Sequence, residues 1–129
     1  MNLTALRACF VRHDRRIEPR MFRQPDGTDK EIVGPVDYFI HCNFADAHGI
    51  RFLCPNNFMK NGGEIGTHEV MIFFAGSPVP PEIGTNAEGQ TVRWAKSGTG
   101  LCDLSLTPSI HEQDDQCGWH GFVTNGDAT

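Results

Sequence analysis

Short hydrophobic runs, separated by glycine, proline and polar turns, make up most of this chain. Several runs alternate apolar and polar residues or are rich in β-branched and aromatic side chains, which is the pattern of strands. About seven short strands are expected, drawn from the segments 6–11, 31–33, 36–42, 49–54, 68–74, 91–95, 101–107 and 121–124. Because the segment 68–74 is the most apolar, we expect it in the centre of a sheet.

Turn sequences separate these segments. The Pro-Asp-Gly sequence ending at Gly27 and the Asn-Gly pair at residues 125–126 are typical of turns, since proline fixes φ and glycine accepts positive φ. Residues 54–63 are expected to form an extended loop or knuckle, and residues 76–89 a surface loop. The arginine-rich stretch after the first strand is expected as a solvated face. The sequence therefore predicts one small domain over residues 1–129, mainly β in class (a β-rich α+β fold).

The composition narrows the class of protein. The formal net charge is −5, whereas nucleic-acid binders usually present a basic patch or stripe, so no nucleic-acid partner is expected. No run approaches the roughly 20 apolar residues that cross a membrane, so no membrane partner is expected either. The N-terminus lacks the pattern of a secretory signal, which favours a cytoplasmic location. The 5 cysteines cannot all pair with one another and are expected to stay reduced there.

A Cys-x-x-His sequence near the C-terminus is the clearest candidate chemistry. Cys117 and His120 stand three residues apart, with Gly118 and Gly121 beside them, so both side chains can turn toward one ion. Cys54, which precedes a proline as knuckle cysteines often do, is the third candidate ligand. We therefore predict a zinc site formed by Cys54, Cys117 and His120, and we assign no catalytic residue.

The fourth zinc ligand stays open. A second knuckle cysteine is expected at position 57, but Asn57 stands there, and an amide is a poor zinc ligand. Cys102 lies on the same inward face of its expected strand as Leu104 and Leu106, so packing in the core is an equal interpretation of that residue. The candidates for the fourth position are Cys42, His68, Cys102, His111 and a water molecule.

Motifs in the last two thirds of the chain resemble those of a known protein family. They are Phe52-Leu-Cys-Pro55, Asn61-Gly-Gly63, Ile65-Gly-Thr-His68, Trp94, Ser97-Gly-Thr-Gly100, Asp103-Leu-Ser-Leu-Thr-Pro-Ser-Ile110 and Cys117-Gly-Trp-His-Gly-Phe-Val-Thr-Asn-Gly126. This set resembles a family of small bacterial and phage proteins of unknown function, sometimes labelled as ammonia monooxygenase. The resemblance covers about residues 48–129 and leaves residues 1–47 as an N-terminal extension expected to pack on that region.

The resemblance implies a zinc-ribbon-like site and a cellular context. Members carry a Cys-Pro-x-Cys knuckle and a later Cys-x-x-His, which correspond here to Cys54, position 57, Cys117 and His120. Because Asn57 stands where members have the second cysteine, the closed four-ligand site of the family lacks one of its ligands here. Members occur in prophages, and some are encoded beside ubiquitin-like conjugation genes. The bacterial host cytoplasm is therefore the expected location.

Three hypotheses for function follow. The favoured one is a phage- or prophage-type accessory protein, a zinc-binding β module that acts by binding an unknown protein partner. The alternative is a zinc-dependent hydrolase with an open Cys₂His site, in which Glu69, Asp103 or Glu112 serves as general base. The third is that Asn57 marks a lost site and that the domain folds without metal. The sequence favours a binding protein over an enzyme, and the oligomeric state is not predicted.

Overall fold

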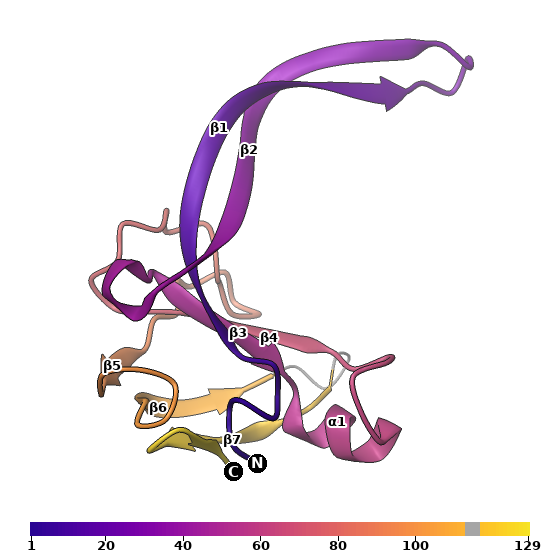
Figure 1. Ribbon diagram of the computed structural model, residues 1–129. Coiled ribbons are helices and arrows are strands. Elements are labelled where there is room, and N and C mark those ends of the chain that lie inside the picture. The colour runs from indigo at the N-terminus through magenta and orange to yellow at the C-terminus, as the bar shows by residue number, and fades with distance from the viewer. Residues whose placement is uncertain (113–116) are drawn as a thin grey trace.

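The computed structural model describes residues 1–112 and 117–129 and contains two four-stranded antiparallel sheets (Figure 1). The first sheet has the order β2-β1-β3-β4 and the second β5-β6-β7-β8. The strands are β1 (Cys9–Arg23), β2 (Asp29–Cys42), β3 (Gly49–Leu53), β4 (Glu69–Phe73), β5 (Ala95–Ser97), β6 (Ser105–His111), β7 (His120–Thr124) and β8 (Asp127–Ala128). The helices are the 3₁₀ turn η1 (Phe44–Asp46) and the short α1 (Pro55–Asn61). The prediction of a small, mainly β protein is confirmed.

The two longest strands form an arm that rises away from the two sheets (Figure 1). β1 and β2 pair without a break from Phe10 opposite Cys42 to Arg23 opposite Asp29. The first strand extends past the predicted residues 6–11 through the arginine-rich stretch, whose arginines are exposed as expected. The predicted segments 31–33 and 36–42 are one strand. Pro35 interrupts the hydrophobic pattern but not β2, because β2 is an edge strand whose outer backbone groups need no partner.

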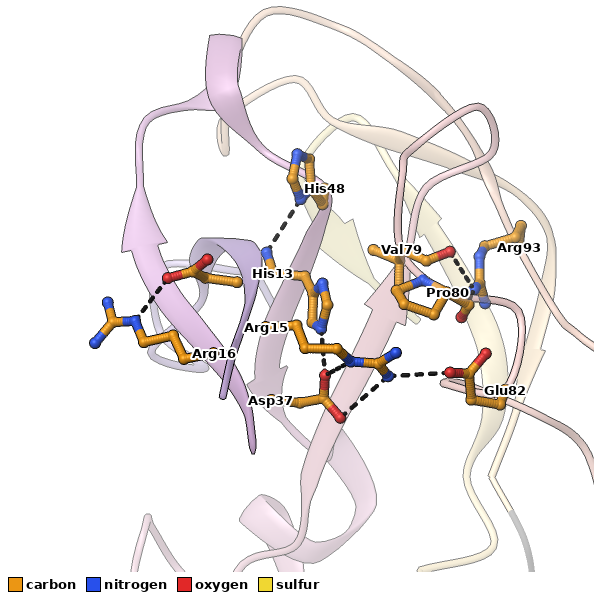
Figure 2. A network of polar contacts seen from close by, with 10 residues as sticks. His13, Arg15, Arg16, Asp37, His48, Val79, Pro80, Glu82 and Arg93 are labelled. Carbon is orange, nitrogen blue, oxygen red and sulfur yellow. Dashed lines mark hydrogen bonds and ion pairs between the residues drawn. The ribbon is translucent and has the colours of Figure 1, made fainter. Parts of the chain in front are cut away.

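Ion pairs fix the base of the arm to the loop that follows β4 (Figure 2). The carboxylate of Asp37 accepts from His13 Nε2 at 2.7 Å and from Arg15 Nε at 2.8 Å. Arg15 also reaches Glu82 Oε1 at 3.0 Å. Arg93 Nη2 donates to the carbonyl oxygen of Pro80 at 3.0 Å and so holds that loop in place. The arm therefore starts from a fixed base, and its outer part extends away from the other elements (Figure 1).

The hydrophobic core draws on both sheets and on the N-terminal segment. Leu3 and Leu6 are fully buried beside residues of β3, β4, β6 and β7. Phe52 of β3 and Trp119, just before β7, meet edge to face with ring centroids 5.8 Å apart. Because the N-terminal residues fill this core, the first residues of the chain and the last sheet form one packed unit.

Several element boundaries differ from the prediction. Residues 55–61 form the helix α1 rather than a loop; Pro55 suits the first helical position, and Gly62 ends the helix with φ 70°. The strand β4 lies at the edge of its sheet rather than at its centre. β6 begins later than expected, so Cys102 lies exposed in the preceding turn rather than inside the strand. Within the described residues, no helix is long and apolar enough to cross a membrane.

Candidate functional site

A break in the ladder between β6 and β7 sets the position of Ser109. Leu106 pairs with Val123 and Ile110 pairs with Gly121, so β6 advances four residues while β7 advances two. Leu106 and Ile110 are both buried, which keeps the inner face of β6 continuous on either side of this bulge. Bulges of this kind redirect side chains next to functional sites. Here the bulge places Ser109 on the outer face of the strand.

Ser109 and two histidines meet on this outer face. His111 lies opposite His120 in the ladder, and their rings stack with centroids 4.9 Å apart. Ser109 is two residues before His111 and so lies on the same side of β6. Its Oγ is 3.3 Å from His120 Nε2. A hydroxyl within reach of an imidazole nitrogen is the arrangement of a nucleophile and its general base.

A groove of about 570 Å³ opens beside Ser109. Its lining includes Met71 and Phe73 of β4, Ser109 and His111 of β6, Trp94, and residues 84–88 of the loop that follows β4. The indole Nε1–H of Trp94 donates to the carbonyl oxygen of Ser109 at 3.3 Å, which ties the groove to the strand that presents the hydroxyl. We call this feature the β4–β6 groove. Its lining combines apolar side chains with polar ones, among them Asn86, Glu88 and Glu112.

The two candidate cysteines lie together on the other side of the Cys-x-x-His turn. Cys54 caps the start of α1 and is fully buried, and Cys117 is partly buried against the same core. Burial, and next a hydrogen bond with Cys54, raise the pKa of Cys117 to about 12. The two thiols are thus neighbours, and Cys117 is held in its neutral form at ordinary pH.

Polar contacts surround this thiol pair. The side-chain oxygen of Asn57 accepts from the backbone N–H of His68 at 3.1 Å, and Cys54 N–H donates to His68 O at 2.8 Å. His68 Nε2 lies 3.5 Å from Glu112 Oε2. Asn57 therefore connects α1 to the start of β4.

The structure brings together two of the three predicted zinc ligands. Cys54 and Cys117 are adjacent, whereas the imidazole of His120 lies against Ser109 and His111. Over residues 1–112 and 117–129, no group of three or more histidine, cysteine, aspartate or glutamate side chains is arranged to hold a metal ion. As these side chains lie, they do not fit a three-ligand zinc site, and zinc binding stays a prediction.

The remaining candidates have other contacts. Asp103, considered as a general base, accepts from Thr99 N at 2.9 Å and Gly100 N at 2.9 Å and stabilises a turn; these bonds lower its pKa. Glu69 is exposed at the start of β4. Within the described residues, neither carboxylate forms a hydrogen bond with Ser109 or His120.

One protein family matches part of the chain. The family model described as a serine protease of a bacterial ubiquitination-like system (BubE) matches residues 68–129. This region contains β4 to β8, and with them Ser109, His111 and His120. No curated protein and no solved structure matches the chain.

Sequence reasoning missed Ser109. In the sequence, the Thr-Pro-Ser-Ile motif points only to a family resemblance, and His120 is predicted as a zinc ligand. Two signals were present: Ser109 and His111 are two residues apart on one strand, and His120 begins the next strand. Alternation places the first two on one face. The bulge between Leu106 and Ile110 sets the alignment of the two strands, however, and no sequence motif marks it.

Proposed function

We propose that this protein is a serine protease of a bacterial ubiquitination-like system, with Ser109 as the nucleophile and His120 as the general base. The observation that carries the proposal is the 3.3 Å approach of Ser109 Oγ to His120 Nε2 beside the β4–β6 groove. The printed description of the family that matches residues 68–129 supports the same class of activity.

The chemistry follows from these two side chains. Ser109 Oγ attacks the carbonyl carbon of the substrate amide, and its proton passes to His120 Nε2. The C–N bond breaks as His120 gives this proton to the leaving amine. Water then attacks the acyl group on Ser109, loses a proton to His120, and the proton returns to Oγ as the acid departs. The net reaction is hydrolysis of one amide bond by one water molecule.

His111 is the residue that can orient the imidazole of His120. Its ring stacks on His120 with 24° between the ring planes, which restricts rotation of the imidazole. Among the residues that the structure describes, no hydrogen bond joins His120 to a carboxylate, so the site is a dyad supported by stacking. A separation of 3.3 Å is long for a hydrogen bond, as is common in catalytic pairs without substrate.

Labelling with a fluorescent fluorophosphonate tests the proposal, since this reagent forms a covalent bond with activated serines. The wild-type protein is expected to be labelled at Ser109, as located by peptide mass spectrometry, and Ser109→Ala to lose the label. Ser97→Ala is the matched control, because Ser97 is exposed on the adjacent β5 and should leave labelling unchanged. Absence of label from the folded wild-type protein would reject the hydrolase.

The second candidate is the zinc-binding accessory module that acts through a protein partner. The observation that favours it is the contact between Cys54 and Cys117, which offers two thiol ligands at one point. Zinc content of untagged protein, measured by plasma mass spectrometry, tests it. About one zinc per chain, lost in Cys117→Ala, would support this candidate, and metal-free folded protein would reject it.

A further inference from the structure

Within the described residues, one edge of β4 pairs with no other strand, and Met71 and Phe73 of this strand line the β4–β6 groove. β4 is the last strand of its sheet, and β3 covers only its inner edge. Cys54 N–H donates to His68 O, and Phe74 N–H donates to His48 O, so the even-numbered residues of this stretch turn their backbone groups toward β3. Alternation then turns the backbone groups of Glu69, Met71 and Phe73 outward.

The chain itself already uses part of this edge. Trp94 N–H donates to Phe73 O at 3.0 Å, and Ala75 N–H donates to Trp94 O at 2.8 Å, in a parallel bridge. The described backbone then leaves the edge, because Val92 N–H bonds instead to Gly84 O. In the described chain, the outward groups of Glu69 and Met71 take no part in any backbone hydrogen bond.

The long strands of the first sheet each carry a proline. β1 carries Pro19 and β2 carries Pro35, each in a part of the arm with one uncovered edge. Proline cannot donate to a ladder, and proteins use it on edge strands to prevent pairing with other chains. β4 contains no proline. In the described chain, the edge of β4 is therefore a proline-free edge of this sheet next to the β4–β6 groove.

We propose that the β4–β6 groove binds its substrate as an added β-strand, through the outward backbone groups of Met71, which lines the groove, and of Glu69, which precedes it on β4, so that the substrate is an extended and flexible peptide segment. The inference deepens the proposed function and rests on it for the fate of the bound peptide. Met71, Phe73 and Trp94 supply an apolar surface for alternate side chains, while the backbone supplies hydrogen bonds independent of sequence. Ser109 and His111 line the same groove, so a peptide bound along β4 would pass near the hydroxyl.

Amide hydrogen exchange in the Ser109→Ala protein tests this binding mode. The probe is an equimolar library of acetylated and amidated hexapeptides. We expect exchange of the Glu69 and Met71 amides to slow by about tenfold when peptide exceeds the dissociation constant tenfold. The amides of Val70 and Ile72 should not change, because they already bond to β3. Equal or absent protection at odd and even positions would overturn the inference.

A proline at the first residue of β4 gives a second test. Glu69→Pro removes one outward N–H and leaves the bonds to β3, and strands tolerate proline at their first residue. Cleavage of an unstructured protein, reduced α-casein, should fall by about fivefold relative to Glu69→Ala, the loss of one hydrogen bond. Equal cleavage by the two variants would count against strand addition.

The results also separate this inference from the hydrolase proposal. Odd–even protection without fluorophosphonate labelling would retain peptide binding on β4 and reject hydrolysis. Labelling of Ser109 without odd–even protection would retain the hydrolase and overturn strand addition. Cleavage of a compact folded protein at the same rate as casein would also overturn it, because a folded surface cannot enter as a strand.

Discussion

Two pairs of side chains lie on either side of the turn from Cys117 to His120, and they differ in their exposure to water. The Cys54–Cys117 pair is in the core, and Cys54 is fully buried. The pair of Ser109 and His120 is on the outer face of β6 and β7, next to a groove. Groups shielded from water contribute mainly to stability, whereas groups that open to a groove can meet a substrate.

Trp119 separates the two pairs. It precedes β7, is buried against Phe52, and packs where Gly121 has no side chain: a Cβ there would lie 2.7 Å from the indole. Alternation then turns His120 outward, away from the buried side of the turn. Three-residue spacing therefore does not by itself direct a cysteine and a histidine to one ion, because a buried residue between them can fix opposite directions.

The largest expected effect is that of His120→Ala. Loss of the general base should slow fluorophosphonate labelling of Ser109 by about 10²–10⁴-fold, while the melting temperature stays close to that of the wild-type protein. His41→Ala is the control, since His41 is an exposed histidine of the arm. If His120→Ala instead unfolds the protein and releases zinc, the two pairs belong to one metal site and the comparison fails.

The next largest expected effect is a slow alkylation of Cys117. Burial and the contact with Cys54 raise its pKa to about 12, so the neutral thiol persists. At pH 8 the smaller thiolate fraction, partly offset by higher nucleophilicity, should slow its reaction with iodoacetamide roughly 30-fold relative to an ordinary thiol. The exposed Cys102 serves as the internal reference in peptide mass spectrometry.

The raised pKa of Cys117 also makes the stability of the fold depend on pH. A thiol whose pKa is raised in the folded state stabilises the fold fully below pH 9, and this contribution is lost as pH rises from about 9 to about 12. Urea unfolding midpoints should fall across this window and fall less in Cys117→Ala. Rapid alkylation of Cys117 at pH 7 would show a thiolate, as expected for a metal ligand or a nucleophile.

The sequence predicted the fold class and most elements of the body, since turns such as Asn125-Gly126 have local chemistry: Asn125 has φ 48° and Gly126 has φ 78°. It did not predict the arm, because strand β1 between Arg12 and Arg23 lacks an apolar period and is held by its partner. The edge position of β4 was missed for a related reason. Its apolar residues face the core on one side and the groove on the other, which resembles burial in a sheet.

Cys54→Ala tests the structural side of the comparison. Cys54 is fully buried, and removing its sulfur leaves a small cavity beside Cys117, so unfolding should be easier by about 1–2 kcal/mol in urea titrations. Cys102→Ala, at an exposed position, should change stability by less than about 0.5 kcal/mol. Labelling of Ser109 should persist in Cys54→Ala. Its loss in a protein that remains folded would mean that the thiol pair supports the catalytic face.

Asn57→Ala should give the smallest effect. The substitution removes the hydrogen bond from His68 N–H and should cost about 1 kcal/mol. Asn56→Ala is the matched control, because Asn56 is an exposed asparagine of the same helix and both changes raise helix propensity equally. The difference between the two urea midpoints isolates the bond to β4. If Asn57→Ala is no less stable than Asn56→Ala, then the hydrogen bond of Asn57 does not stabilise the junction between α1 and β4. The thiol pair would then maintain that junction alone.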